Sequence, residues 1–304
     1  MLSIFVTIVN FNSSEHTLSC LKSLDAVSRK DFDLNVVVVD NASAEPFDVL
    51  EKDYKNFKLV LIKSRINTGF AGGQNLAIKK ALDGNADFIV VLNNDVILDK
   101  NFLINLLKTF SDKPDCGLVS PKIYFAKGHE FHKDRYEERD LGKVLWYAGG
   151  RIDWKNVLGD HRGVDEVDNG QYDKLEETDY VSGCAAMIKR EVFEKTGLFD
   201  EKYFLYYEDN DLSQRARKSG FAIYFQPESY LWHLNAGSTG GSGSQLHDYY
   251  ITRNRLLFGF RYASLRAKLA LLKESIRLVY SGRKWQKRGA LDFYIGRMGK
   301  GSFK

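Results

Sequence analysis

Four short apolar runs separated by helical segments constrain the fold of this chain more than any other feature. The runs cover residues 2–9, 34–39, 58–62 and 88–92. The second and fourth are continuous rather than alternating, which is typical of strands buried on both faces of a sheet. Strands that alternate with helices form right-handed βαβ units. The sequence therefore predicts an α/β fold with a mainly parallel sheet flanked by helices.

A polar triplet, Asn93, Asn94 and Asp95, directly follows the fourth run. Open α/β sheets bind ligands at the carboxyl ends of their strands. One carboxylate placed there can hold a divalent metal, and a metal with few protein ligands usually binds phosphate groups of the substrate as well. Asn and Asp also favour turns, because they tolerate the left-handed conformation and bond their own backbone. Taken alone, the triplet fits a turn or a metal site.

Polar residues also follow the second and third runs. Asp40 ends the second run and is followed by Asn41, Ala42 and Ser43. After the third run comes the glycine-rich segment 67–73, and we expect a helix over residues 74–82. Asp40 is therefore a second polar group at a carboxyl strand end.

Three carboxylates follow an aromatic run at the start of a helix that we expect to end near Gly220. Acids in a first helical turn complement the helix dipole, and Asp211 is spaced to pair with Arg215. That explanation does not cover Glu208 and Asp209, which directly follow the aromatic residues. Partial burial there would raise a carboxyl pKa toward that of a general base. Glu208 and Asp209 are therefore candidate catalytic residues.

The middle of the chain is less regular and leaves several interpretations open. His233 follows a short apolar segment and is either a metal ligand or a satisfied core histidine. We expect a strand over residues 180–188, where small side chains permit close approach of a ligand or another backbone. Residues 127–142 and 159–178 are expected to be polar loops. Residues 236–244 have the composition of a linker or an active-site lid.

The overall composition is that of a soluble globular protein, with 304 residues and 44% hydrophobic content. Nothing at the N-terminus resembles a signal peptide, and no stretch reaches transmembrane length. The cysteines, Cys20, Cys116 and Cys184, are widely spaced and odd in number. That usage favours buried thiols in a reducing cytoplasm over a disulfide framework or a metal cluster.

Positive charge is concentrated in the last part of the chain. The net charge of +4 is the sum of a strongly basic tail over residues 261–304 and a net negative charge over residues 1–260. In the tail, apolar residues repeat at helical spacing: Leu265, Leu269, Leu272, Ile276 and Val279. Basic residues between them fit an amphipathic helix on an anionic membrane surface. The same periodicity fits a helix packed on the main domain or on a second subunit. No recognisable nucleic-acid-binding motif accompanies the basic residues, so nucleic acid is not an expected partner.

Six motifs in a fixed order carry a resemblance to a known family. They are residues 6–12 (VTIVNFN), 38–43 (VVDNAS), 67–73 (NTGFAGG), 93–95 (NND), 208–211 (EDND) and 232–233 (WH). In this order they resemble the family 2 inverting glycosyltransferases of the GT-A fold, most closely the bacterial rhamnosyltransferase-like branch. The resemblance implies a GT-A catalytic domain over residues 1–260 and a basic helical extension over residues 261–304.

The resemblance implies roles for five residues at the nucleotide. Asp40 and the backbone around Thr7 and Val9 would hold the nucleobase. Asn67 and Gly72 would border the nucleotide.

The resemblance also implies a metal site and a catalytic base. Asn94 and Asp95 would form the DXD-type element, with Asp95 ligating Mg²⁺ or Mn²⁺ that bridges the donor phosphates. His233 resembles the downstream metal ligand of related enzymes. Asp209 resembles the base that deprotonates the acceptor, although spacing alone leaves Glu208 open as the base.

The implied reaction transfers rhamnose or another hexose from a dTDP- or UDP-sugar to a saccharide or lipid-linked saccharide. Such a reaction belongs to cell-surface polysaccharide synthesis. It would take place in the cytoplasm or peripherally at the inner face of the plasma membrane. A homo-oligomer is compatible with this interpretation. A Rossmann dehydrogenase is disfavoured because the glycines at 69, 72 and 73 do not make a GxGxxG motif. A non-catalytic nucleotide-sugar-binding or scaffold protein would lose Asp209 or His233, and both are present.

Overall fold

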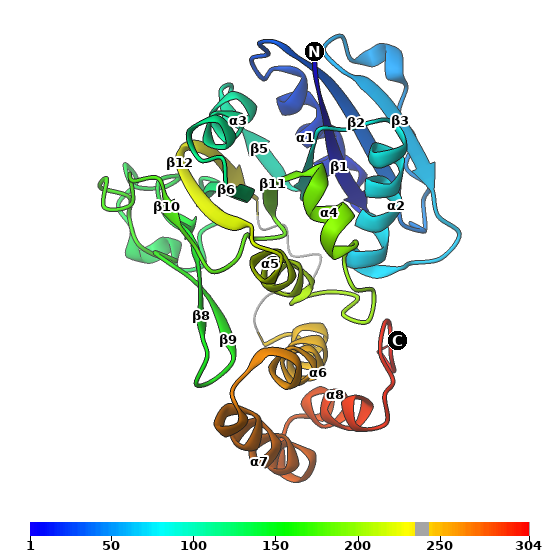
Figure 1. Cartoon of the computed structure of the whole chain (residues 1–304), viewed down its shortest axis with the longest axis vertical. Helices are drawn as coiled ribbons and strands as arrows, with labels where there is room; N and C mark the ends of the chain where they lie inside the picture. Colours follow the sequence, from blue (N-terminus) through cyan, green and yellow to red (C-terminus); the bar gives the residue numbers. More distant parts are fainter. Residues whose placement is uncertain (235–242, 304) are drawn as a thin grey trace.

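The computed structural model describes residues 1–234 and 243–303 and is built around one ten-stranded, twisted sheet (Figure 1). Its main path, in spatial order, runs through β10 (Glu176–Glu177), β12 (Ala222–His233), β6 (Cys116–Phe125), β11 (Ala185–Lys189), β4 (Phe88–Leu92), β1 (Leu2–Asn10), β2 (Phe32–Asp40) and β3 (Lys58–Lys63). Two short strands extend it, β5 (Val96–Leu98) beside β12 and β7 (Leu145–Tyr147) beside β6. A separate antiparallel hairpin is formed by β8 (Gly150–Asp153) and β9 (Leu158–His161).

The four predicted strands form the parallel half of this sheet, in the order β4-β1-β2-β3. Asn10 lies opposite Asp40 in the β1–β2 register, and Ile8 lies opposite Leu92 in the β1–β4 register. The carboxyl ends of β1, β2 and β4 therefore meet at one edge, where the polar residues of the sequence gather. The predicted mainly parallel α/β fold is confirmed.

Helices cover both faces of the sheet. They are α1 (Ser14–Asp25), α2 (Gly69–Asp83), α3 (Phe102–Asp112), α4 (Arg190–Thr196) and α5 (Glu208–Lys218). Val36 and Val38 face the core that contains residues of α1 and α3, whereas Val37 and Val39 face the core beneath α2, α4 and α5. This alternation explains why the second apolar run is continuous, because both faces of β2 are buried. All three cysteines are buried and unpaired.

Two predicted boundaries are wrong for identifiable reasons. Helix α2 begins at Gly69, five residues before the predicted start at residue 74, because its glycines form the first turn instead of a loop. Gly69 has a φ of +74°, and a Cβ there would lie 2.4 Å from the carbonyl oxygen of Phe204. The strand predicted over residues 180–188 begins only at Ala185, after a turn in which the Ala185 N–H donates to the Ser182 carbonyl (3.2 Å). This strand, β11, runs antiparallel to β4 and β6.

The expected polar loop over residues 159–178 is also only partly correct. It contains the end of β9 and all of β10, which pairs with β12. Its first residues matter for the site, as shown below. The predicted lid or linker over residues 236–244 lies largely outside the described residues. Ser244 is described and caps the next helix, accepting the N–H of His247 (3.2 Å).

Three helices form the C-terminal group: α6 (Gln245–Tyr262), α7 (Leu265–Ser281) and α8 (Lys284–Tyr294). They lie together below α5, at the end of the molecule remote from the N-terminus (Figure 1). The predicted boundary after residue 260 falls in the last turn of α6, and the division into two domains stays a prediction. Across residues 1–234 and 243–303, no helix has the length and apolar character needed to cross a membrane.

Asp211 fastens α6 to α5. Its carboxylate is fully buried and accepts from the Nε of Arg215 (2.8 Å), as the four-residue spacing predicts. It also accepts from Arg261 (2.9 Å) and from the hydroxyl of Tyr262 (2.8 Å), both near the end of α6. Charge-assisted hydrogen bonds of this kind are roughly twice as strong as neutral ones. Asp211 therefore holds the two helices together.

The loop before α5 depends on α6 in a second way. Phe204, Tyr206 and Tyr207 have positive φ values of 65°, 68° and 71°, which are strained conformations for side chains of this size. The buried Asn254 amide donates to the carbonyls of Tyr203 (2.8 Å), Leu205 (2.7 Å) and Tyr206 (2.9 Å). One side chain of α6 thus satisfies three carbonyls of the strained loop.

We expect Asn254→Ala to lower the free energy of unfolding by about 1–3 kcal/mol, because it removes the Asn254 donor from the part-buried carbonyls of Leu205 and Tyr206. Urea unfolding followed by circular dichroism measures the loss. Asn105→Ala is a matched control, since the Asn105 amide reaches only the exposed carbonyl of Glu228. Equal losses in the two variants would contradict the assigned role of Asn254.

Candidate active site

A buried acid–imidazole pair lies at the carboxyl edge of the sheet. Asp95 follows β4, and His233 is the last residue of β12, where it pairs in register with Val96 of β5. The Nε2 atom of His233 lies 3.1 Å from Oδ1 of Asp95, and the two residues are 5% and 9% exposed. Residues 138 positions apart in the sequence are thus brought together by the β5–β12 pairing.

The geometry of this pair fits a divalent metal. Two ligand atoms, each about 2.1 Å from one ion and at right angles to each other, lie about 3 Å apart. The observed 3.1 Å separation therefore suits joint coordination without rearrangement. Within the described part of the chain, no group of three or more His, Cys, Asp or Glu side chains could hold a metal. An ion at this pair would take its remaining ligands from water and a bound phosphate, as Mg²⁺ does in many phosphate sites.

An aromatic ring packs against His233. The ring of Trp146 lies edge-on to that of His233 at 4.8 Å, and it also packs against the ring of His161 at 4.3 Å. Burial, together with the nearby His233, lowers the pKa of His161 to about 4, so that ring is neutral at physiological pH. Trp146 and His161 were missed in the sequence, because nothing in their spacing connects them with residue 233.

A buried polar network links the ends of β1, β2 and β4. The Asn94 amide donates to the hydroxyl of Thr17 (2.9 Å), which donates to Oδ1 of Asn10 (2.8 Å). The Asn10 amide in turn donates to Asp40 (3.1 Å). Asp40 also accepts from the Ser43 hydroxyl (2.5 Å) and, through its other oxygen, from the N–H of residue 47 (3.1 Å). Asp40 and Asn94 are therefore held rigidly, through Thr17 and Asn10, which the sequence analysis did not single out as site residues.

The other predicted nucleotide residues lie along β1 and at the start of α2. Thr7 is fully buried inside the sheet and donates its hydroxyl to the Val90 carbonyl (3.2 Å). Val9 lies nearer the edge, opposite residue 39. Asn67 accepts the N–H of Gly69 (2.8 Å), and Gly72 allows close packing, since a Cβ there would lie 2.6 Å from the Cβ of residue 68. Their contact with a nucleotide stays a prediction.

The carboxylates at the start of α5 differ in their surroundings. Asp209 accepts the N–H of Gly183 (2.9 Å) and both the N–H (2.7 Å) and the amide (3.0 Å) of Asn210. Burial raises the pKa of the Asp209 carboxyl above its ordinary value, and these donors partly oppose the shift. Glu208 is 4% exposed and its Oε2 has no hydrogen-bond partner among the described residues. Burial, and next the charge of Asp209, raises the pKa of Glu208 well above its ordinary value.

The turn at residues 182–184 connects the acid–imidazole pair with the carboxylates. The N–H of Asn93 donates to the carbonyl of Cys184 (2.8 Å), next to Gly183, which binds Asp209. A Cβ on Gly183 would lie 3.2 Å from the ring of Phe70 and 3.5 Å from Oδ2 of Asp209. Two side chains therefore approach Gly183 closely, whereas the sequence predicted close approach of a ligand or another backbone. Adjacent residues of one turn thus bind Asp209 and Asn93, which is two residues before Asp95.

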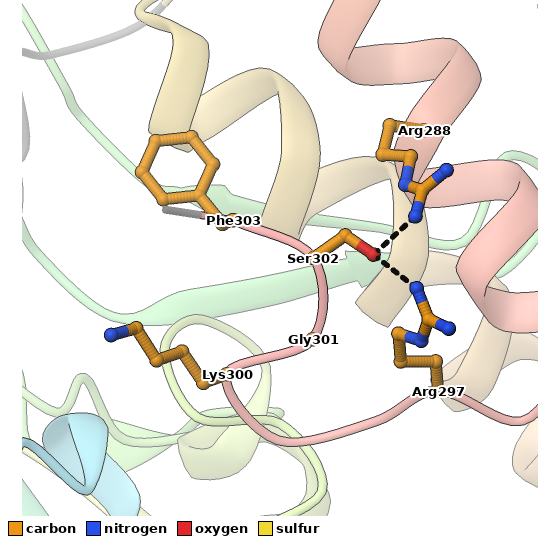
Figure 2. A pocket seen from close by; sticks show the side chains of 6 residues that line it. All are labelled: Arg288, Arg297, Lys300, Gly301, Ser302 and Phe303. Atoms are coloured by element: carbon orange, nitrogen blue, oxygen red, sulfur yellow. Dashed lines mark hydrogen bonds between the residues drawn. The ribbon is translucent and has the colours of Figure 1, made fainter.

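An open hollow of about 670 Å³ lies in the C-terminal group, away from this edge (Figure 2). Its lining residues are Arg288, Arg297, Lys300, Gly301, Ser302 and Phe303. The Ser302 hydroxyl accepts from Arg288 (2.7 Å) and Arg297 (2.8 Å), so the two guanidinium groups converge on it (Figure 2). None of the predicted site residues contributes to this hollow.

Comparisons with known proteins identify the family and the fold of this chain. The model of the glycosyltransferase-like family 2 matches residues 3–256. An N-acetylglucosaminyl-diphospho-decaprenol L-rhamnosyltransferase of Mycobacterium tuberculosis is 25% identical over 251 residues, covering 77% of each chain. The dTDP-rhamnosyl transferase RfbF of Shigella flexneri is 24% identical over 265 residues, covering 84% of this chain and 79% of the relative. A low-salt glycan biosynthesis hexosyltransferase, Agl10 of Haloferax volcanii, is 26% identical, and this chain spans 62% of its length.

Solved structures with the same fold include GalNAc-T7 with UDP, GalNAc and Mn²⁺, with a TM-score of 0.58, 16% identity and coverage of 83% of this chain and 48% of that one. A mannosyltransferase of Pyrobaculum calidifontis in complex with GDP-Man and Mn²⁺ has a TM-score of 0.53 and 15% identity, and covers 96% of this chain and 74% of that one. These similarities show the GT-A fold. Since the family model spans most of the chain, the protein belongs to the glycosyltransferase-like family 2 and is a glycosyltransferase.

Proposed function

We propose that this glycosyltransferase moves a hexose, with inversion, from a nucleoside-diphosphate sugar to a hydroxyl group of a saccharide acceptor. The carrying observation is the buried Asp95–His233 pair at the carboxyl edge of the sheet, together with the Asp209 carboxylate, which is held by Gly183 next to the Cys184 carbonyl that binds Asn93. One side of the site can thus hold the departing diphosphate and the other can receive a proton. A single displacement with inversion needs these two functions on opposite sides of the anomeric carbon.

The leaving side of the site is assigned to Asp95 and His233. Their oxygen and nitrogen atoms would hold Mg²⁺ or Mn²⁺, which neutralises charge on the diphosphate as the glycosidic bond breaks. Asn94 is fixed by Thr17 beside this pair and is assigned to positioning the phosphates. Support for a divalent ion comes from two similar folds whose structures contain Mn²⁺. The buried position of the pair keeps it preorganised for binding.

The attacking side is assigned to Asp209 as general base. The Asp209 carboxylate takes the proton of the acceptor hydroxyl. The acceptor's own oxygen then forms the bond to the anomeric carbon, and the diphosphate leaves with the electrons of the bond that breaks. Asp209 is held in place by three N–H donors from Gly183 and Asn210, which favour its ionised form. Glu208 is more deeply enclosed, and its raised pKa favours the neutral form. These differences favour Asp209 over Glu208 as the base.

The proposed donor is dTDP-rhamnose, with UDP-glucose or UDP-galactose next. One similar protein is a dTDP-rhamnosyl transferase, and another is a rhamnosyltransferase acting on N-acetylglucosaminyl-diphospho-decaprenol. The proposed nucleobase contacts are Asp40 and the β1 backbone near Thr7 and Val9, with Asn67 and Gly72 bordering the nucleotide. By the same similarity, the proposed acceptor is a lipid-linked saccharide of cell-surface polysaccharide synthesis. The enzyme would then work in the cytoplasm, at the inner face of the membrane.

We expect Asp209→Asn to lower kcat by roughly 10²–10⁴-fold, because the amide cannot accept the proton, while donor binding stays unchanged. Rates are measured with a panel of nucleotide sugars and a saccharide acceptor in the presence of Mn²⁺. Glu208→Gln is the matched control. Since Glu208 is assigned as neutral, its amide variant should retain most of the activity. Full activity of Asp209→Asn would sink the assignment, and loss only in Glu208→Gln would reverse the two roles.

We expect Asp95→Asn and His233→Gln to weaken metal-dependent binding of the nucleoside diphosphate by roughly 10–100-fold, the range typical of disturbed metal sites. Calorimetric titration of dTDP and UDP, with Mn²⁺ and with EDTA, measures the effect. Asp99→Asn is the control, because its carboxylate caps the turn before α3 at the other end of β5. Metal-independent binding that is equal in wild type and both variants would contradict the proposed site.

The raised pKa of Glu208 also predicts how stability depends on pH. An acid whose pKa is higher in the folded state binds more protons folded than unfolded, so it costs stability as pH rises above its unfolded pKa. We therefore expect Glu208→Gln to gain free energy of unfolding relative to wild type as the pH rises above the ordinary glutamate pKa of 4.5. Urea unfolding at several pH values measures this difference. A difference that does not change with pH would show that Glu208 ionises freely in the folded protein.

A further inference from the structure

Helix α7 has two faces, and the face that packs against the protein is the less apolar one. Ala267, Leu271 and Ser275 are 4%, 3% and 1% exposed. Leu271 lies against Gly259 of α6, and the hydroxyl of Ser275 shares a hydrogen bond with that of Tyr294 at the end of α8. Small or single apolar side chains thus dock α7 onto its neighbours.

The apolar stripe predicted from the sequence lies mainly on the opposite face. Leu265 is 73% exposed, Leu269 58% and Ile276 48%, while Leu272 and Val279 are only partly buried. Tyr280, 78% exposed, extends the stripe. Spacings of four, seven and eleven residues place these exposed side chains on one face of a helix. The prediction of an amphipathic helix is confirmed, but its apolar face is turned away from the rest of the chain.

Basic residues border this stripe. Arg266, Lys273 and Arg277 are exposed beside it, and Lys268 lies on its other border. None of the four forms an ion pair within residues 1–234 and 243–303. The one acid of the helix, Glu274, is turned toward α6, where it pairs with Arg255 (2.9 Å). The outer face of α7 is therefore both apolar and positively charged.

We propose that this outer face docks on a lipid bilayer that contains anionic phospholipids. The apolar side chains enter the boundary between headgroups and acyl chains, and the basic residues contact lipid phosphates. A second copy of the chain fits less well, because a symmetric pairing through this face would bring the same basic residues of both copies together. Helix α7 also lies at the end of the molecule remote from the N-terminus (Figure 1).

The neighbouring helix also has exposed apolar side chains. Leu291, Tyr294 and Ile295 at the end of α8 are 41%, 44% and 63% exposed. Tyr294 is joined to the packing face of α7 through Ser275, so the end of α8 lies beside α7. Several large apolar side chains anchor an interfacial helix more firmly than charge alone.

This inference rests on the proposed function only for the reason why the enzyme would need a membrane, and it specifies which surface binds that membrane. Docking is measured without donor or acceptor, and sugar transfer is measured with a soluble acceptor. Either result can therefore fail while the other stands.

The test is co-sedimentation of the full chain with vesicles of phosphatidylcholine and with vesicles of an equal mixture of phosphatidylcholine and phosphatidylglycerol. We expect binding to the mixed vesicles only. Leu269→Gln combined with Ile276→Gln should weaken that binding roughly tenfold or more, because each large apolar side chain buried in the interface contributes on the order of a tenfold change in affinity. Removing the charges of Arg266, Lys273 and Arg277 as Gln should weaken it by roughly fivefold for each residue.

Leu50→Gln is the matched control, because Leu50 is 52% exposed and lies far from α7 in the sequence. Thermal unfolding should be unchanged in all variants, since the replaced side chains are exposed. Wild type that fails to bind the mixed vesicles would overturn the proposal, as would undiminished binding by the double Gln variant. A wild-type dimer that becomes a monomer in the double variant, as measured by light scattering, would show instead that this face joins two copies.

Discussion

The hydrogen bonds from α6 to the loop before α5 hold the acidic end of the site in position. Asn254 donates to three carbonyls of a loop whose residues have left-handed backbone conformations, and Asp211 ties the following helix back to α6. Without these bonds the strained loop could relax and move Asp209 away from the turn at Gly183. Helix α6 therefore helps to position the start of α5, and the family match extends into this helix, through residue 256.

The parallel half of the sheet and its polar strand ends could be predicted because local signals agree there. Continuous apolar runs, each followed by Asn or Asp, define both the strands and the edge at which Asp40 and Asp95 lie. The direction of β11 could not be predicted, since a short apolar run carries no information on direction. Trp146 and His161 were missed for a similar reason. The ring contacts of Trp146 with His233 and His161 depend on the fold and leave no spacing pattern in the sequence.

Helix α7 shows a different limit of sequence reasoning. Periodicity located its apolar stripe correctly but could not decide whether protein, lipid or a second copy covers it. The structure shows that the rest of this chain does not cover the stripe, because Ala267, Leu271 and Ser275 form the face of α7 that contacts the protein. A helix can thus use its smaller residues for internal packing and keep its larger ones for an external surface.

The pairing of Asp95 with His233 has a consequence for the order of events in the site. Two protein atoms fill only part of a metal's coordination shell, so a cation and a diphosphate at this position would complete each other's binding. Linkage requires that each raise the affinity for the other by the same factor. With a cation held by Asp95 and His233 as proposed, the nucleoside diphosphate left after transfer would still carry phosphates that bind it, so product and ion would leave as one complex. Turnover could then be limited by the departure of that complex, and free nucleoside diphosphate would inhibit the enzyme more strongly as the metal concentration rises.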